Sequence, residues 1–109
     1  MTVYVDDMHR SALGAFKGMR MSHMIADDEA ELHAMADAIG MPRRSYQGNH
    51  YDVPLERRAM AVALGAVQVS MKQMAGMVVR QRETGQLGPP GEAEAWARAY
   101  WRGRLRRMG

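Results

Sequence analysis

The first half of the chain carries histidine and aspartate residues that two predicted strands could bring together. His50 and Asp52 are two residues apart, and a strand directs side chains at this spacing to one face. Asp6 and Asp7 follow a short β-branched and aromatic run, where a strand would end. Such groups can bind a divalent metal, or they can perform general acid–base chemistry with His50 as the base. If the chain is an enzyme, the catalytic candidates are therefore His50, Asp52, Asp6 and Asp7.

Other polar side chains around this group suit an anionic ligand. Arginine has a rigid donor fork that matches phosphate, and a helix predicted from residue 54 would start with unpaired backbone N–H groups. Glutamine and tyrosine add hydrogen-bonding and stacking surface, and two further histidines lie in the same half of the chain. The ligand-binding candidates are Arg43, Arg44, Gln47, Tyr51, Arg57, His23 and His33. The cofactor stays open, with a divalent metal as the candidate.

Each candidate also has a structural alternative. His23 alternates with apolar neighbours and could be a histidine packed inside the fold. His33 is four residues from both Glu29 and Asp37, which is the spacing of pairs on a helix surface. Asp52 could favour the start of the helix that follows it. The spacing matches no established metal-binding motif, so the sequence leaves both interpretations open.

An α+β fold has to position these residues. A β-branched and aromatic run at residues 2–6, alternation over residues 21–26, and two segments around a Gly48-Asn49 turn predict a small mixed sheet, with strands over residues 2–6, 21–26, 43–47 and 50–53. Apolar residues at helical spacing predict three helices packed on that sheet, over residues 28–39, 54–64 and 71–83. Asp28 and Glu31 form a capping box at the start of the first helix. Residues 8–20 show no clean period and are predicted to form a loop.

A glycine- and proline-rich stretch separates the last helix from the rest of the chain. We predict a single α+β domain over residues 1–84, a linker over residues 85–91 and a C-terminal basic amphipathic helix over residues 92–109. Trp96, Tyr100 and Trp101 give this helix an aromatic surface that a small core can barely cover. We therefore predict a homo-oligomer that assembles through the C-terminal helix.

Composition and charge restrict the function classes further. Hydrophobic residues make up 47% and charged residues 25% of the chain, which is typical of a globular protein. The absence of cysteine excludes disulfides, a thiolate nucleophile and a cysteine zinc site. There is no signal peptide or membrane-spanning run, which predicts a cytoplasmic protein without a membrane partner. Residues 1–42 carry three basic and seven acidic side chains, whereas residues 43–109 carry twelve basic and five acidic ones. This asymmetry favours an anionic partner or pairing between the two halves.

Several short motifs occur in a distinctive order: Tyr4-Val5-Asp6-Asp7, Ser22-His23 with Ala26-Asp27, Glu31-Leu32-His33, Ile39-Gly40, His50-Tyr51-Asp52, and Arg57 through Gly65-Ala66. Over roughly residues 1–80, this order resembles a family of small bacterial and bacteriophage proteins known as a domain of unknown function. The resemblance implies a shared polar set, namely Asp6, Asp7, His23, His33, His50, Tyr51, Asp52 and Arg57. It supplies no activity. By association alone, the phage distribution suggests a protein that sequesters or degrades a nucleotide signal.

Three functions remain. The first is a small-ligand binding protein for a nucleotide or another phosphorylated metabolite. The second is a hydrolase acting on a nucleotide or phosphoester through a His/Asp site, with or without a metal. The third is a nucleic-acid-binding protein that uses the basic C-terminal half, for which affinity should fall steeply with salt. The first is the leading prediction, and turnover would separate the second from it.

Overall fold

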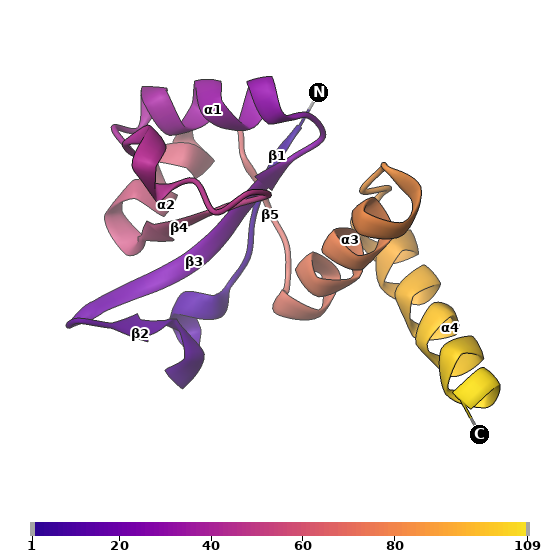
Figure 1. The fold of residues 1–109 in the computed structure, drawn as a ribbon. Helices are drawn as coiled ribbons and strands as arrows, with labels where there is room; N and C mark the ends of the chain where they lie inside the picture. The colour runs from indigo at the N-terminus through magenta and orange to yellow at the C-terminus, as the bar shows by residue number, and fades with distance from the viewer. Residues whose placement is uncertain (1, 109) are drawn as a thin grey trace. The chain divides into compact units, whose positions relative to one another are not determined.

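A computed structural model describes residues 2–108 of the chain, which divides into two compact units (Figure 1). The first unit ends at Ser70 and contains the sheet, and the second begins at Met71 and contains a pair of helices. The α+β class predicted from the sequence is confirmed, as is the C-terminal helix. The sequence prediction drew its domain boundary at residues 85–91, and the limits 1–84 and 92–109 stay a prediction.

A mixed sheet of five strands forms the first unit. The strands are β1 (Val3–Val5), β2 (Ala15–Phe16), β3 (Met19–Ala26), β4 (Tyr51–Pro54) and β5 (Val67–Gln68). The long strand β3 pairs antiparallel with β1, β2 and β4, while β1 pairs parallel with β5. The mixed character of the sheet therefore comes from the single parallel pair at β5, and β3 is the strand that joins the others.

Two helices, α1 (Glu29–Ala38) and α2 (Leu55–Ala63), pack on one face of this sheet. Their buried side chains meet alternate strand residues such as Val5, Met24 and Val53 in one apolar core. The predicted cap of α1 is confirmed, because the Asp28 carboxylate accepts a hydrogen bond of 2.7 Å from the Glu31 backbone N–H. Since strand side chains alternate, the residues between the core positions point to the opposite face.

Two sequence predictions about the first unit are wrong. Residues 43–47 are not a strand: a 3-10 helix runs over Arg43–Ser45, and Tyr46 makes a single bridge to Tyr51. The chain turns back at Gly48 (φ +91°), directly after that bridge, so no ladder can extend. Residues 8–20 are not a loop throughout, because they contain two 3-10 turns, Met8–Arg10 and Ala12–Gly14, followed by the β2–β3 hairpin.

The second unit consists of α3 (Met71–Thr84) and α4 (Pro90–Met108), which pack against each other. Gly76 on α3 allows the close approach, since a Cβ there would lie 2.7 Å from the Glu94 Cα. Trp101 and Leu105 on α4 are exposed, and assembly through this helix stays a prediction. None of the helices within residues 2–108 combines the length and the apolar character that crossing a bilayer requires.

Candidate metal centre

The register of three strands brings the predicted site residues into one row. His23 on β3 lies directly opposite Asp52 on β4. The Asp6 backbone N–H donates to the His23 carbonyl at 3.1 Å, which continues the β1–β3 ladder by one residue. All three side chains therefore project from the sheet face opposite to α1 and α2. His50 precedes Asp52 by two residues and joins this face from the turn closed by the hydrogen bond from Gln47 N–H to the His50 carbonyl.

Three side-chain atoms converge on this face. The Nε2 atoms of His50 and His23 lie 3.4 Å and 3.9 Å from the Oδ1 atom of Asp52, and the two imidazole centroids are 5.3 Å apart. The Asp52 Oδ1 atom is buried, yet it accepts no hydrogen bond within the described part of the chain. A buried carboxylate oxygen without a hydrogen bond is costly, and a bound cation would remove that cost.

Neighbouring residues orient both imidazoles. Asp6 is buried, its Oδ1 atom accepts the backbone N–H groups of Met8 and His23, and its Oδ2 atom lies 2.7 Å from the His23 Nδ1 atom. His50 Nδ1 lies 2.6 Å from the Asn49 side-chain oxygen. Both oxygens accept hydrogen bonds, so each Nδ1 carries a proton, and in the neutral imidazole each Nε2 presents its lone pair to the other ligand atoms. Metal-binding histidines show this arrangement.

The charges around the site suit a cation. Burial alone would raise the pKa of Asp6, but the hydrogen bonds from the His23 side chain and the backbone hold it below its usual value. The hydrogen bond to Asp6 raises the pKa of His23, against the opposing effect of burial, so a metal ion would have to displace a proton from the Nε2 atom of His23 at lower pH. Burial lowers the pKa of His50, and this effect prevails over the opposing charge of Asp52. Asp6 is therefore a carboxylate and His50 a neutral imidazole near pH 7.

The ligand set points to a transition metal. Two imidazoles and one carboxylate suit Zn²⁺, Fe²⁺, Co²⁺ or Mn²⁺, whereas Ca²⁺ and Mg²⁺ prefer oxygen ligands alone. With bonds of about 2.0–2.2 Å, two ligand atoms of one ion are at most about 4.2 Å apart. Both distances to Asp52 meet that limit, and all three ligand atoms lie within 4.8 Å of one another. For one ion to bind all three side chains, the two Nε2 atoms would also have to lie within about 4.2 Å of each other, which rotation of an imidazole can achieve.

We predict that Asp6→Asn lowers the affinity for Zn²⁺ by about 10- to 100-fold, as loss of an outer partner typically does. Asparagine can still accept the two backbone N–H groups through its oxygen. Its amide N–H, however, donates to His23 Nδ1, so the proton of the imidazole has to move to Nε2. The Nε2 lone pair is then no longer available to a metal ion. Competition with a coloured chelator would measure the change. Asp27→Asn is the matched control, since the Asp27 carboxylate accepts a hydrogen bond from the Thr2 N–H and lies outside the His23–His50–Asp52 group. Equal affinities of both variants and the wild type would contradict the role of Asp6.

Several predicted site residues lie elsewhere. Tyr51 is fully buried on the core side of the sheet, where its hydroxyl lies 2.6 Å from the Nδ1 atom of His33. The Nε2 atom of His33 pairs with Glu29 at 3.2 Å. Arg43 is exposed and lies 3.9 Å from Asp37, and Asp7 stands at the start of the 3-10 turn over Met8–Arg10. None of the four candidates in this set, Tyr51, His33, Arg43 and Asp7, supplies a ligand atom to the His23–His50–Asp52 group.

Arg57 stabilises the end of α1. Its guanidinium donates a hydrogen bond of 2.7 Å to the carbonyl of Ile39. Ile39 is the C-cap of α1, and carbonyls at a helix end receive no hydrogen bond from a following turn of the helix. We predict that Arg57→Ala lowers the free energy of unfolding by about 1–3 kcal/mol, because a charged hydrogen bond is lost. The affinity for Zn²⁺ should stay unchanged. Urea unfolding measures the first quantity, with Arg43→Ala as an exposed control expected within about 0.5 kcal/mol of the wild type. A loss of metal binding in Arg57→Ala would place Arg57 in the site after all.

Two residues near the site were not among the sequence candidates. Asn49 was read only as a turn residue, yet its side chain orients His50. Arg58 is buried and donates from Nε to the Asp6 carbonyl at 2.8 Å, and from its guanidinium to Gln68 at 3.1 Å, so it ties β1 to β5. Gln47 was a candidate, and it donates to the Asp52 Oδ2 atom at 2.8 Å. The sequence signal for Asn49 was its position directly before His50.

Comparisons with known proteins identify a family but no activity. The family model described as "Protein of unknown function (DUF4031)" matches residues 3–81, which include every strand, α1, α2 and most of α3. No curated protein and no solved structure matches the chain. The matched range contains all the residues of the candidate metal centre and ends before α4 begins.

Proposed function

Because the chain belongs to the DUF4031 family, for which no function is known, its activity has to be inferred from the site, and we propose a metal-dependent phosphoester hydrolase. The metal is a divalent transition-metal ion held by His23, His50 and Asp52. The observation that carries the proposal is the buried Asp52 Oδ1 atom, which accepts no hydrogen bond from residues 2–108 and lies 3.4 and 3.9 Å from two imidazole Nε2 atoms.

Three protein ligands favour catalysis over a purely structural role. Structural zinc sites are closed by four protein ligands, whereas catalytic sites keep a position for water or substrate. A bound divalent metal lowers the pKa of its water to about 7 and so supplies hydroxide near neutral pH. The side chains of His23, His50 and Asp52 are each partly exposed, which allows water and a substrate to reach the ion.

The surroundings support a phosphoester as the substrate. Arg44, Ser45 and Gln47 border a cavity that has Asp52 in its wall. A metal and an arginine are the usual partners of phosphoryl oxygens, and hydroxyl and amide groups can bind the rest of a sugar or ester. In the proposed reaction, the hydroxide oxygen bonds to phosphorus and the ester P–O bond breaks. The leaving alkoxide takes a proton from water.

Turnover tests the proposal. The chain would be stripped with a chelator, reloaded with Zn²⁺, Mn²⁺ or Co²⁺, and assayed on p-nitrophenyl phosphate and bis(p-nitrophenyl) phosphate. We expect hydrolysis with at least one of these metals and none without metal. His33→Ala, a histidine outside the site, should keep the activity. If the loaded chain binds phosphate esters without hydrolysing them, the proposal fails, and the binding protein predicted from the sequence takes its place.

A further inference from the structure

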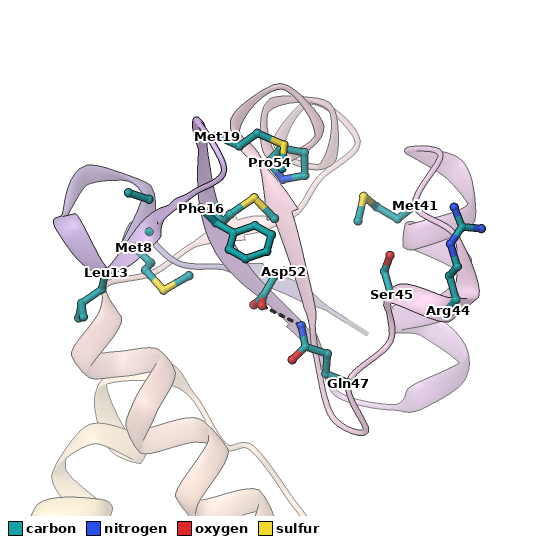
Figure 2. Close-up of a pocket in the computed structure, with 13 residues that line it drawn as sticks. Met8, Leu13, Phe16, Met19, Met41, Arg44, Ser45, Gln47, Asp52 and Pro54 are labelled. Carbon is teal, nitrogen blue, oxygen red and sulfur yellow. Dashed lines mark hydrogen bonds between the residues drawn. The ribbon is translucent and has the colours of Figure 1, made fainter.

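A cavity in the first unit adjoins the candidate metal centre. Its volume is about 770 Å³, within the range of about 300–1,000 Å³ that is typical of small-molecule sites. The β2–β3 hairpin forms one side, the 41–47 segment forms another, and Asp52 and Pro54 of β4 lie between them (Figure 2). A ligand in this cavity would therefore touch the metal-binding strand.

The lining of the cavity is divided into an apolar and a polar part. Four methionines, Met8, Met19, Met21 and Met41, are among the apolar residues of the lining. Methionine is adaptable and makes favourable contacts with aromatic rings. Figure 2 shows Met8 reaching in from the hairpin side and Met41 from the other side. The polar lining residues are Arg44, Ser45, Gln47 and Asp52, so the lining suits a ligand that has both a flat apolar group and polar groups.

Phe16 provides an aromatic surface at this cavity. Its side chain lines the cavity although the residue is 54% exposed, and in Figure 2 its ring is directed from the hairpin toward β4. The two-residue turn Lys17-Gly18, with φ angles of 50° and 78°, fixes the hairpin that carries it. The Lys17 ammonium lies 5.2 Å from the ring centroid and adds positive charge. An exposed aromatic ring beside methionines and a cation is suited to stacking a base.

We propose that this cavity binds a nucleoside phosphoester, with the base against Phe16 and the phosphate at the metal beside Asp52. The inference rests on the proposed function and names its substrate class. A sugar phosphate alone would leave the methionines and Phe16 without a partner. An alkyl phosphate would offer Ser45 and Gln47 no sugar hydroxyl group to bind. A nucleoside phosphoester matches both parts of the lining.

Equilibrium dialysis of the Zn²⁺-loaded chain with adenosine 5′-monophosphate, ribose 5-phosphate and adenosine tests the inference. We expect adenosine 5′-monophosphate to bind at least about tenfold more tightly than ribose 5-phosphate, as base stacking allows. Phe16→Ala should remove that advantage, and Phe16→Trp should retain it. Leu64→Ala is the control, because Leu64 is equally exposed but lies outside this cavity.

The outcomes separate this inference from the proposed function. Equal binding of the two phosphates, or no effect of Phe16→Ala, overturns the nucleoside inference even if the chain binds Zn²⁺ and hydrolyses simple esters. A chain that retains no Zn²⁺ overturns the proposed function instead. In that case, adenosine binding that Phe16→Ala weakens would still support the base site, and its absence would overturn it.

Discussion

Asp52→Ala should lower the affinity for Zn²⁺ by more than about 100-fold, because a direct ligand is worth more than an outer partner. The metal-free variant should nevertheless unfold within about 1 kcal/mol of the wild type. The Oδ1 atom of Asp52 accepts no hydrogen bond, and its Oδ2 atom accepts one exposed hydrogen bond from Gln47. A residue that binds a metal but contributes little to the fold has this combination of effects.

The two quantities are measured separately. Isothermal titration with Zn²⁺ gives the affinity, and urea unfolding in the presence of a chelator gives the free energy of unfolding. Asp37→Ala is the matched control, since Asp37 is an exposed carboxylate near Arg43 and outside the site. If Asp52→Ala binds Zn²⁺ as the wild type does, Asp52 is not a ligand. If the metal-free variant is destabilised by several kcal/mol, Asp52 is a structural residue.

The second large effect is expected at the helix pair of the second unit. Gly76→Leu should lower the free energy of unfolding by about 3 kcal/mol, at the upper end of the usual cost of overpacking. A Cβ at Gly76 would lie 2.7 Å from the Glu94 Cα and 2.8 Å from the Ala93 carbonyl oxygen. These are backbone atoms of α4, so the helices would have to separate to accept any side chain.

Gly103→Ala, in the same unit, should raise the free energy of unfolding slightly instead of lowering it. A Cβ there would approach only the Arg107 guanidinium, at 3.4 Å, and that flexible side chain can move. Alanine is the better helix former by about 1 kcal/mol, so the variant should be slightly more stable than the wild type. Circular dichroism during urea unfolding measures both variants. A Gly76→Leu protein as stable as the wild type would show that α3 and α4 do not pack through this glycine.

The strongly patterned elements were predictable from the sequence. The α1 helix was found from its spacing and its Asp28 cap, β1 from its β-branched and aromatic composition, and β3 from its alternating pattern over residues 21–26. The 43–47 segment was predicted as a strand because it precedes the Gly48-Asn49 turn, but it has no β-branched residue, and local 3-10 hydrogen bonds after Pro42 prevailed over pairing. The Lys17-Gly18 hairpin was missed because its flanking strand, Ala15–Phe16, is too short to show alternation.

The composition of the site was partly predictable, and its geometry was not. The pairing of His50 with Asp52 follows from their spacing on one strand. The central position of His23 depends on the register of β3 against both β1 and β4, which no local pattern encodes. Tyr51 and Arg57 adjoin the site in sequence but point toward the core and to the end of α1. One residue along a strand changes the face, so closeness in sequence is a poor guide here.

The account depends most on the identity of the metal ligands, and nitrogen NMR of the four histidines tests it directly. On addition of one equivalent of Zn²⁺ to the ¹⁵N-labelled chain, the Nε2 signals of His23 and His50 should shift together and then stop changing. Their Nδ1 atoms should keep their protons, because Asp6 and Asn49 accept them. The signals of His9 and His33 should not move. Unchanged His23 and His50 signals, or a shift at His9 or His33 instead, would contradict the metal centre.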